Sequence, residues 1–266
     1  MNQITSVSVL GGGWLGLPLA LSLKKKSLLV KISTTTDSKL EIFSQQGLEP
    51  HKIILDQNSQ GMGTFLKTDV LIICFPPKIK SQSPEYFYNQ IEILCQAIAK
   101  EKSIQKIIFV SSTSIYTSNK GLKTENDADP KHYLFKAEKL LKENLPDKTI
   151  LIVRMAGLMG YDRNPCKYFG IRDFNPQSRV NYIHRDDAVE VLDWLALNFA
   201  ENITVNLCAP LHPTRGQIAE VVCKQNYGNF NEDLAEGEGK IVDSTHFESI
   251  FQKKLKYPDP LNFKYL

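Results

Sequence analysis

The sequence predicts an α/β protein built on a doubly wound parallel sheet, with a small additional lobe towards the C-terminus. Over the first 154 residues, short apolar runs alternate with longer amphipathic runs, which is the order of strands and helices in such a sheet. Several of the short runs are apolar throughout, as strands covered by helices on both faces must be. A chain of 266 residues with 42% hydrophobic content is long enough to bury the core that this fold requires.

The elements follow one another from the N-terminus in this alternating order. Strands are expected at 6–10, 28–33, 52–55, 70–75, 106–111 and 149–154, and helices at 14–25, 37–46, 84–100 and 131–144. Residues 156–180 are rich in Gly, Pro, Asn and Arg and are predicted to form a loop. A helix at 185–198 and a strand at 203–207 then return to the pattern of the sheet, and a further helix is expected at 214–224 before a polar stretch and a proline-containing tail.

This order predicts two parts that are each discontinuous in sequence. The main domain takes residues 1–156 and 181–208, and the small lobe takes residues 157–180 and 209–266.

A glycine-rich turn between the first strand and the first helix is the most informative motif. Gly11, Gly12, Gly13, Trp14, Leu15 and Gly16 fit the pattern G-x-G-x-x-G directly after an apolar strand and directly before an apolar helix. In that setting Gly11 allows a tight turn, Gly13 lets the backbone approach a pyrophosphate, and Gly16 lets the helix pack closely on the sheet. The motif therefore predicts a Rossmann-type dinucleotide-binding domain with phosphates at the helix N-terminus. A glycine-rich turn that binds nothing is the alternative.

Composition excludes several other classes of protein. The net charge is only +3, and the short lysine clusters at 24–26 and 253–254 lack interleaved aromatic residues, so no nucleic-acid partner is expected. The apolar run at 7–23 contains glycines and Pro18 and has no basic segment before it, so neither a signal peptide nor a membrane span is expected.

Five widely spaced cysteines form no C-x-x-C pair. Neither a disulfide framework nor a zinc site is expected from them, and a reducing cytoplasm fits this pattern. No metal site is expected elsewhere, because His184 with its two following aspartates has no second ligand cluster.

Motifs along nearly the whole chain resemble the atypical extended short-chain dehydrogenase/reductases, the NAD-dependent epimerase/dehydratase family. They are SSTSIY at 111–116, RMAGLMG at 154–160 followed by Arg163, VNYIHRDD at 180–187, VNL at 205–207 and YPD at 257–259. Within that family the chain is most similar to the YeeZ-like branch, through GWLG at 13–16, SSTS at 111–114, CAP at 208–210 followed by HP at 212–213, GKI at 239–241 and YPDP at 257–260. The resemblance implies a Rossmann fold, a nicotinamide cofactor and a small-molecule substrate, and it leaves the substrate unnamed.

Family chemistry uses a Ser or Thr, a Tyr and a Lys, and the hydroxyl of Ser112 matches the first of these. The family's next helix carries Y-x-x-x-K, whereas here Tyr133 and Lys136 are three residues apart. Counted back from the A-E pair at 137–138, the family's Tyr and Lys positions fall on Pro130 and Leu134. Residues three apart still share a helix face, so Tyr133 and Lys136 are the candidate proton-transfer pair. A surface tyrosine beside a solvated lysine is the alternative.

The choice of cofactor is expected to depend on the end of the second strand. An NAD site usually has an acidic residue there, and this chain has the hydroxyls of Ser33, Thr34 and Thr35 instead. Asp37 follows at a plausible distance but is expected to cap the next helix. The hydroxyls, with a nearby lysine, favour NADP over NAD, and an ordinary Ser/Thr-rich turn is the alternative.

Other candidates lie where the carboxyl ends of the strands face the crevice, or where the family resemblance places the pocket. For the cofactor they are Phe75, Pro76, Pro77 and Ser111; for the substrate they are Tyr116, Arg163, Asn181, His184 and Lys240.

We therefore expect reversible hydride transfer at a carbinol or carbonyl carbon of a small, sugar-nucleotide-like substrate, as in an oxidoreductase or epimerase. The irregular Tyr/Lys spacing keeps open an alternative, a non-catalytic NAD(P)-binding module that senses redox state or binds a partner. The resemblance also implies a homodimer through the helices at 84–100 and 131–144, with a purely internal role for their apolar residues as the alternative.

Overall fold

The computed structural model describes residues 3–56, 62–79, 81–117, 120–168, 175–224 and 239–266, and the chain forms two compact units. The first unit contains residues 1–111, 130–153 and 189–204, and the second contains residues 112–129, 154–188 and 205–266. The small lobe predicted at 157–180 and 209–266 falls within the second unit, which also includes the chain that directly follows the fifth strand.

A seven-stranded sheet is the framework of the fold, with the strand order β10-β7-β5-β4-β1-β2-β3. Its strands are β1 (Ser6–Leu10), β2 (Leu29–Thr34), β3 (Glu49–Lys52), β4 (Val70–Ile73), β5 (Lys106–Ser112), β7 (Thr149–Met155) and β10 (Ile203–Leu207). The ladders that join β1 to β2 and β4, β2 to β3, and β4 to β5 are parallel. The prediction of a Rossmann-type parallel sheet is confirmed.

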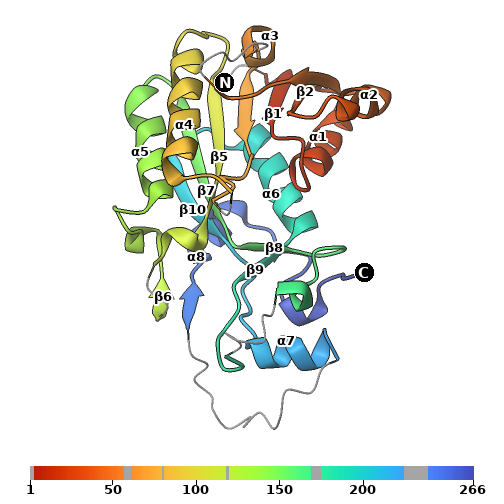
Figure 1. Ribbon diagram of the computed structural model, residues 1–266, viewed down its shortest axis with the longest axis vertical. Helices are drawn as coiled ribbons and strands as arrows, with labels where there is room; N and C mark the ends of the chain where they lie inside the picture. Colours follow the sequence, from red (N-terminus) through yellow and green to blue (C-terminus); the bar gives the residue numbers. More distant parts are fainter. Residues whose placement is uncertain (1–2, 57–61, 80, 118–119, 169–174, 225–238) are drawn as a thin grey trace. The chain divides into compact units, whose positions relative to one another are not determined.

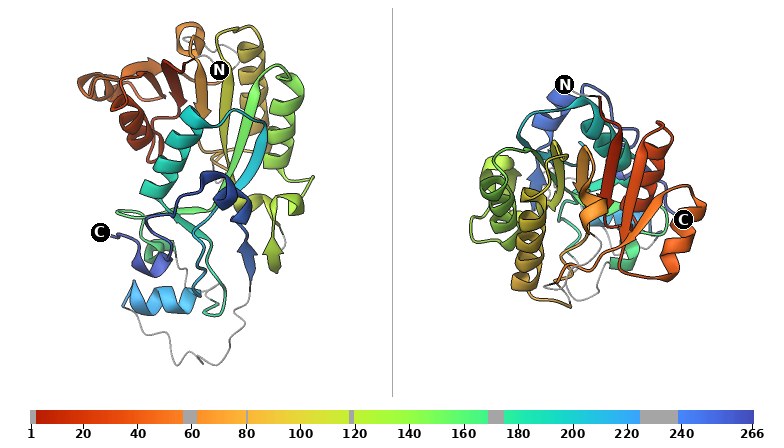
Figure 2. Two further views of the ribbon diagram at one scale, coloured as in Figure 1. Left: turned by 180° about the vertical axis from the view of Figure 1, so that it is seen from behind. Right: turned by 90° about the horizontal axis from the view of Figure 1, so that it is seen from above.

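Helices cover both faces of this sheet, which explains why its central strands are apolar throughout. α4 (Pro84–Ala99) and α5 (Tyr133–Asn144) lie side by side on one face, and α1 (Gly16–Lys24) and α6 (Arg185–Asn198) lie on the other (Figures 1 and 2). Asp193 of α6 accepts a hydrogen bond from Ser22 and pairs with Lys26, so charge and hydrogen bonding join α6 to α1 and the turn after it. Val7, Val9 and all four residues of β4 are fully buried.

Most predicted elements of the first unit end within two residues of their observed limits, but the strand predicted at 52–55 is wrong. The strand is β3, Glu49–Lys52, and it contains Pro50. Proline lacks an N–H for the ladder and is tolerated on edge strands; β3 lies at the edge of the sheet. The short helix α3 (Met62–Leu66), which follows β3, was not predicted, whereas α2 spans Ser38–Gln45, within one residue of its predicted limits at each end.

The second unit holds two small parallel ribbons of three-residue strands. β6 (Gly121–Lys123) pairs with β11 (Lys240–Val242), and β8 (Gly157–Met159) pairs with β9 (Tyr182–His184). The prediction that 156–180 is entirely loop is therefore wrong at β8. The helices of this unit are α7 (Arg215–Val221), shorter than predicted, and α8 (Thr245–Phe251), and most of the polar stretch before β11 lies outside the described residues.

A disulfide joins Cys166 to Cys223, so the expectation that the cysteines form no disulfide is wrong. Cys166 lies in the 3-10 helix η3 (Pro165–Tyr168), Cys223 follows α7, and the two are 57 residues apart in sequence. Such a pair is brought together by tertiary folding and leaves no spacing signal in the sequence. The cysteine pattern consequently gives no support to a reducing compartment.

Candidate functional site

The glycine turn after β1 is held against the neighbouring strands by the backbone itself. Gly11 has a φ of +116°, and its N–H donates to Ser33 Oγ at 2.9 Å, while the N–H of Gly12 donates to the Ser33 carbonyl at 2.7 Å. A Cβ on Gly11 would lie 2.9 Å from the Phe75 nitrogen, and one on Gly16 would lie 2.0 Å from the Gly11 carbonyl oxygen. These two glycines are therefore required by close packing of the turn on its neighbours.

Gly13 is different, because a Cβ built there meets no atom within 4 Å. Its backbone is exposed at the point where α1 begins. The first residues of α1 have neither a side-chain cap nor an acidic residue. A helix start of this kind leaves backbone N–H groups for an anion, so the turn has both the space and the donors that a pyrophosphate needs.

The hydroxyls at the end of β2 serve mainly to build the turn. Ser33 is 3% exposed and accepts from Gly11, and Thr34 is 8% exposed and accepts from the N–H of Thr36 at 3.0 Å. Thr35 is exposed. Of the three residues predicted for a 2′-phosphate, only Thr35 is therefore open to solvent.

Asp37 occupies the N-cap position of α2, but its side chain makes no capping hydrogen bond, which corrects the capping expectation. Its carboxylate instead binds Lys52 Nζ at 2.8 Å. The register of β2 and β3 places Lys52 directly opposite Thr34. Sequence reasoning named no lysine for this position, because the partner of Thr34 is fixed by strand pairing and β3 was predicted at 52–55 instead of 49–52.

Phe75, Pro76 and Pro77 follow β4 beside the glycine turn. The Phe75 ring makes an edge contact with Phe87 of α4, with the centroids 5.7 Å apart, which fixes this segment to the helix. Before it, Cys74 donates its thiol hydrogen to the Gly11 carbonyl, and burial raises the pKa of that thiol to about 12. Cys74 is consequently a packing residue of the turn.

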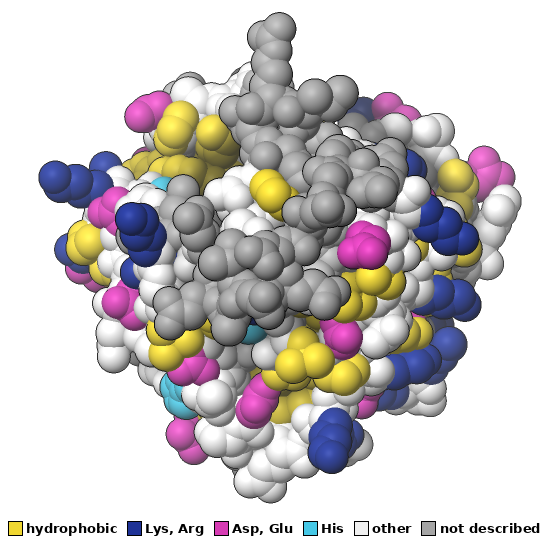
Figure 3. Space-filling view, turned by 90° about the horizontal axis from the view of Figure 1, so that it is seen from below, with side chains coloured by type: hydrophobic (Ala, Val, Ile, Leu, Met, Phe, Trp, Pro, Cys, Tyr) yellow, Lys and Arg dark blue, Asp and Glu magenta, His cyan; other side chains and the backbone are white. Residues whose placement is uncertain are grey.

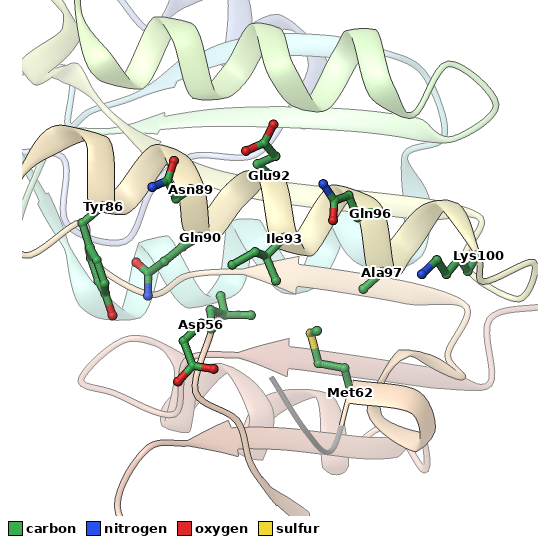
Figure 4. A pocket seen from close by; sticks show the side chains of 11 residues that line it. Asp56, Met62, Tyr86, Asn89, Gln90, Glu92, Ile93, Gln96, Ala97 and Lys100 are labelled. Carbon is green, nitrogen blue, oxygen red and sulfur yellow. The ribbon is translucent and has the colours of Figure 1, made fainter. Parts of the chain in front are cut away.

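A groove of about 740 Å³ runs along the outer side of α4 in the first unit (Figure 4). One wall is α4 and the other is the chain after β3 together with α3; the lining residues are Leu55, Asp56, Met62, Tyr86, Asn89, Gln90, Glu92, Ile93, Gln96, Ala97 and Lys100. In Figure 4 Asp56 lies opposite Tyr86 and Gln90, so polar groups face one another across one end of the groove. Sequence reasoning did not identify this groove, because its walls come from segments far apart in the chain.

The predicted catalytic residues are distributed over both units. In the first unit, Tyr133 and Lys136 lie three residues apart on α5, and the Tyr133 ring makes an edge contact with Phe87 at 6.1 Å. Ser111 donates to the buried carboxyl of Glu138 on the same helix at 2.6 Å. In the second unit, Ser112 Oγ accepts from the N–H of Ser114 and caps the 3-10 helix η1 (Thr113–Ile115).

Tyr116 is buried in the second unit and its hydroxyl is fully engaged. It donates to Asn206 Oδ1 and accepts from Arg154 at 3.1 Å. Burial raises the pKa of this hydroxyl, and its hydrogen bonds with Arg154 and Asn206 oppose that shift. These contacts fit a structural anchor better than a proton donor.

Asn181 and Lys240, both predicted to face substrate, are brought together in the second unit. Asn181 donates to the Lys240 carbonyl at 2.9 Å and accepts from the N–H of Val242 at 2.7 Å. The Lys240 ammonium donates to the carbonyls of Thr113 and Tyr116, at 3.2 and 2.8 Å. These two hydrogen bonds hold the turn that follows Ser112, and burial lowers the pKa of Lys240.

His184 lies fully buried among aromatic rings of the second unit. Its ring is 3.9 Å from that of Tyr257, centroid to centroid, and its Nδ1 accepts from the N–H of Asp186 at 3.2 Å. A Cβ on Gly160, which has a φ of +118°, would lie 2.6 Å from His184 Nε2. Burial lowers the pKa of His184. Arg163 is half-buried, beside the turn at Gly160.

Within the described ranges, no group of three or more His, Cys, Asp or Glu residues is arranged to hold a metal ion. No helix in the part of the chain that the structure describes is long and apolar enough to span a bilayer. Basic and acidic side chains are interspersed on the face drawn in Figure 3.

Comparison with solved structures places the fold. UDP-glucose 4-epimerase of Thermotoga maritima, solved with UDP-glucose, superposes with a TM-score of 0.72 at 14% identity, covering 95% of this chain and 94% of that one. UDP-N-acetylglucosamine 4-epimerase of Bacillus cereus gives 0.68 at 17% identity over 95% and 94%, and vestitone reductase of alfalfa gives 0.70 at 15% identity over 98% and 94%. The chain therefore shares the fold of these two epimerases and of this reductase.

Sequence comparison identifies a relative of higher identity. The chain is 28% identical to Protein YeeZ of Escherichia coli K12 over 270 residues, covering 96% of this chain and 97% of that protein. It is a homologue of YeeZ over its full length, which confirms the resemblance to the YeeZ-like branch. No protein-family model matches the sequence.

Proposed function

We propose that this protein binds NADP or NAD at the glycine turn and acts as an oxidoreductase or epimerase by hydride transfer. One observation carries the proposal: Gly11 and Gly16 are fixed by close packing, whereas Gly13, between them, opens onto free space at an uncapped helix start. A purely structural turn needs glycine at positions 11 and 16 but does not need glycine at position 13. The pattern fits a dinucleotide pyrophosphate bound against the backbone of Gly13.

The remaining contacts to the cofactor would come from the ends of neighbouring strands. Thr35 and the chain after β2 would face the adenosine ribose, and Phe75, Pro76 and Pro77 would cover the dinucleotide beside the turn. At the end of the groove near Asp56, polar side chains would form hydrogen bonds with the amino group and the ring nitrogens of the adenine. When bound, the nicotinamide supplies or accepts the hydride, and the protein supplies orientation and proton transfer.

For proton transfer we propose the pair Tyr133 and Lys136 on α5. The Tyr133 hydroxyl would exchange the proton, and the Lys136 ammonium would lower the pKa of that tyrosine from its ordinary value of about 10. The role expected of the Ser112 hydroxyl, orienting the substrate oxygen, stays a prediction. Tyr133 and Lys136 share one side of α5, as this role requires. The anchored hydroxyl of Tyr116 leaves Tyr133 as the better placed of the two tyrosines.

Substrate contacts are proposed chiefly for Arg163, a half-buried cation beside the turn at Gly160. A guanidinium at this position suits a small anionic substrate, such as one carrying a phosphate.

A second function rests on a specific observation about α5. Leu134, at the position of the family lysine, is 2% exposed and part of the core, so the family's own pair is absent. A binding module that senses redox state through NAD(P) without turnover is consistent with that loss.

Titration with NADPH and NADH, followed by a screen of sugars, ketones and aldehydes for oxidation of the reduced cofactor, tests both proposals. Binding together with turnover supports the enzyme, and tight binding with no turnover across the screen supports the binding module. Absence of binding by either nucleotide contradicts both.

We also propose the homodimer, although fewer apolar residues are left for its interface than the sequence suggested. Phe87, Ile91, Leu94 and Ile98 of α4 are buried within the single chain, so an interface would have to use the half-buried Phe135 and Leu140 of α5. Sedimentation at micromolar concentration tests it, and a monomer would contradict it.

A further inference from the structure

The ion pair between Asp37 and Lys52 lies where a dinucleotide's adenosine ribose would be expected. Both side chains are at the carboxyl ends of their strands or just beyond, and both are open to solvent, with 72% and 44% of their side-chain surface exposed. The pair bridges β3 and the start of α2 next to Thr35. The position of this ion pair depends on the register of β2 and β3, and no sequence motif indicates it.

The other polar groups of this corner are already committed to the fold. The ammonium of Lys31, on β2, is buried and donates to the carbonyls of Thr64 and Lys67 at 2.7 and 2.6 Å. Ser33 holds the glycine turn and Thr34 holds its own loop. At the β2–β3 edge, within the part of the chain that the structure describes, Lys52 is the cation that pairs with an exposed carboxylate.

We propose that Lys52 and Asp37 together determine whether the protein selects NADPH or NADH, an inference that rests on the dinucleotide function proposed above. Lys52 binds the 2′-phosphate of NADPH, and Asp37 holds the lysine in place while competing with the phosphate for its charge. An exposed pair of this kind contributes little to stability, so the ammonium exchanges its carboxylate partner at small cost. A phosphate dianion is the stronger partner for an ammonium, because it carries more charge and more acceptor oxygens.

Opposite effects of the two residues distinguish this mechanism from other uses of the same site. Without Lys52, NADPH loses a charge-assisted hydrogen bond that NADH never had. Without the Asp37 charge, Lys52 is released to the phosphate and NADPH gains. If Asp37 instead accepted from the ribose 2′-hydroxyl of NADH, its removal would weaken NADH binding.

The test measures dissociation constants of NADPH and NADH for the parent protein, Lys52→Ala, Asp37→Asn and a matched control, Lys39→Ala, at low salt. Lys39 is an exposed lysine at the start of α2, and replacing it by alanine also removes one positive charge near the end of β2. We expect Lys52→Ala to weaken NADPH about tenfold to a hundredfold while NADH changes less than about twofold. Asp37→Asn should tighten NADPH by about twofold to tenfold, and Lys39→Ala should leave the ratio of the two constants unchanged.

Adenosine 2′,5′-bisphosphate and adenosine 5′-monophosphate, measured by calorimetry, isolate the 2′-phosphate from the rest of the cofactor. The bisphosphate should bind the parent more tightly than the monophosphate, and this advantage should disappear in Lys52→Ala. Thermal melts of all variants should match the parent, because both side chains are exposed.

Other results would overturn the role of Lys52, the role of Asp37 or the proposed dinucleotide function. An unchanged NADPH/NADH ratio in Lys52→Ala, or a larger loss in Lys39→Ala, overturns the assignment of Lys52. Weaker NADH binding by Asp37→Asn overturns the competing role of Asp37. Failure of the parent protein to bind either dinucleotide overturns the proposed function and this inference with it, whereas binding with an unchanged ratio overturns only the inference.

Discussion

Replacing Gly13 by valine should separate cofactor binding from folding. The structure leaves space for the new side chain, since a Cβ there meets nothing within 4 Å and Gly13 does not have a positive φ. The free energy of unfolding should therefore change by no more than about 1 kcal/mol. The valine methyl groups would occupy the space in front of the exposed backbone, which is where a pyrophosphate would have to lie.

The loss of affinity can be estimated from the contacts that valine would block. Two charge-assisted hydrogen bonds from backbone N–H groups, at about 1.5–3 kcal/mol each, give a total of about 3–6 kcal/mol. That corresponds to a dissociation constant raised by about 10² to 10⁴-fold. NADPH fluorescence titrated with protein measures this change directly.

Gly16→Ala is the matched comparison, because it adds a smaller side chain three residues along the same turn. Its Cβ would lie 2.0 Å from the Gly11 carbonyl oxygen, which belongs to the backbone and cannot move aside cheaply. We expect Gly16→Ala to lower the melting temperature, by about 2–4 °C for each kcal/mol lost, while Gly13→Val leaves it nearly unchanged. NADPH affinity within threefold of the parent in a folded Gly13→Val would refute the reasoning.

Three further predictions concern proton transfer, the disulfide and pH. Tyr133→Phe should reduce turnover of any accepted carbonyl substrate by about 10² to 10⁴-fold with cofactor affinity unchanged, and a silent substitution would show that the pair on α5 does not act in catalysis. A non-reducing peptide map should contain a fragment linking Cys166 to Cys223, and reduction should cost up to about 4 kcal/mol of stability, as expected for closing a span of 57 residues; two free thiols in the purified protein would contradict the pairing. Burial lowers the pKa of His184 below its ordinary value of 6.5, so below that pH the unfolded chain binds a proton that the folded chain does not. The unfolding free energy should thus fall with decreasing pH by up to about 1.4 kcal/mol per pH unit, the slope should shrink in His184→Phe, and the exposed His246→Gln should keep it.

Much of the first unit could be predicted from the sequence because its signals are local. The alternation of apolar and amphipathic runs reflects strands buried on both faces, and the glycine motif lies within six consecutive residues, 11–16. Where a signal was non-local, prediction failed: β3 was placed too late, because its Pro50 is tolerated only at a sheet edge that the sequence does not show.

The second unit was predicted less well for the same reason. Its strands are three residues long, too short for a periodic pattern, and β6 pairs with β11 from more than a hundred residues away. The disulfide likewise depends on tertiary proximity and not on spacing.

In the candidate site too, local features could be predicted from the sequence and non-local features could not. The glycine turn was found from its motif, but the ion pair of Asp37 with Lys52 depends on strand register. The family resemblance placed Asn181 and Lys240 near a pocket. Only the structure shows that the Asn181 side chain binds the backbone of Lys240 and Val242, and that the Lys240 ammonium binds the turn after Ser112. Motifs identify which residues gather at a site, and contacts decide which of them remain available to a ligand.

A crystal structure of the protein with NADPH at saturating concentration tests the central claim most directly. The account predicts pyrophosphate oxygens at about 2.7–3.2 Å from backbone N–H groups at the start of α1, lying over Gly13. A dinucleotide bound elsewhere on the chain, or a glycine turn with no nucleotide density at that concentration, would contradict it.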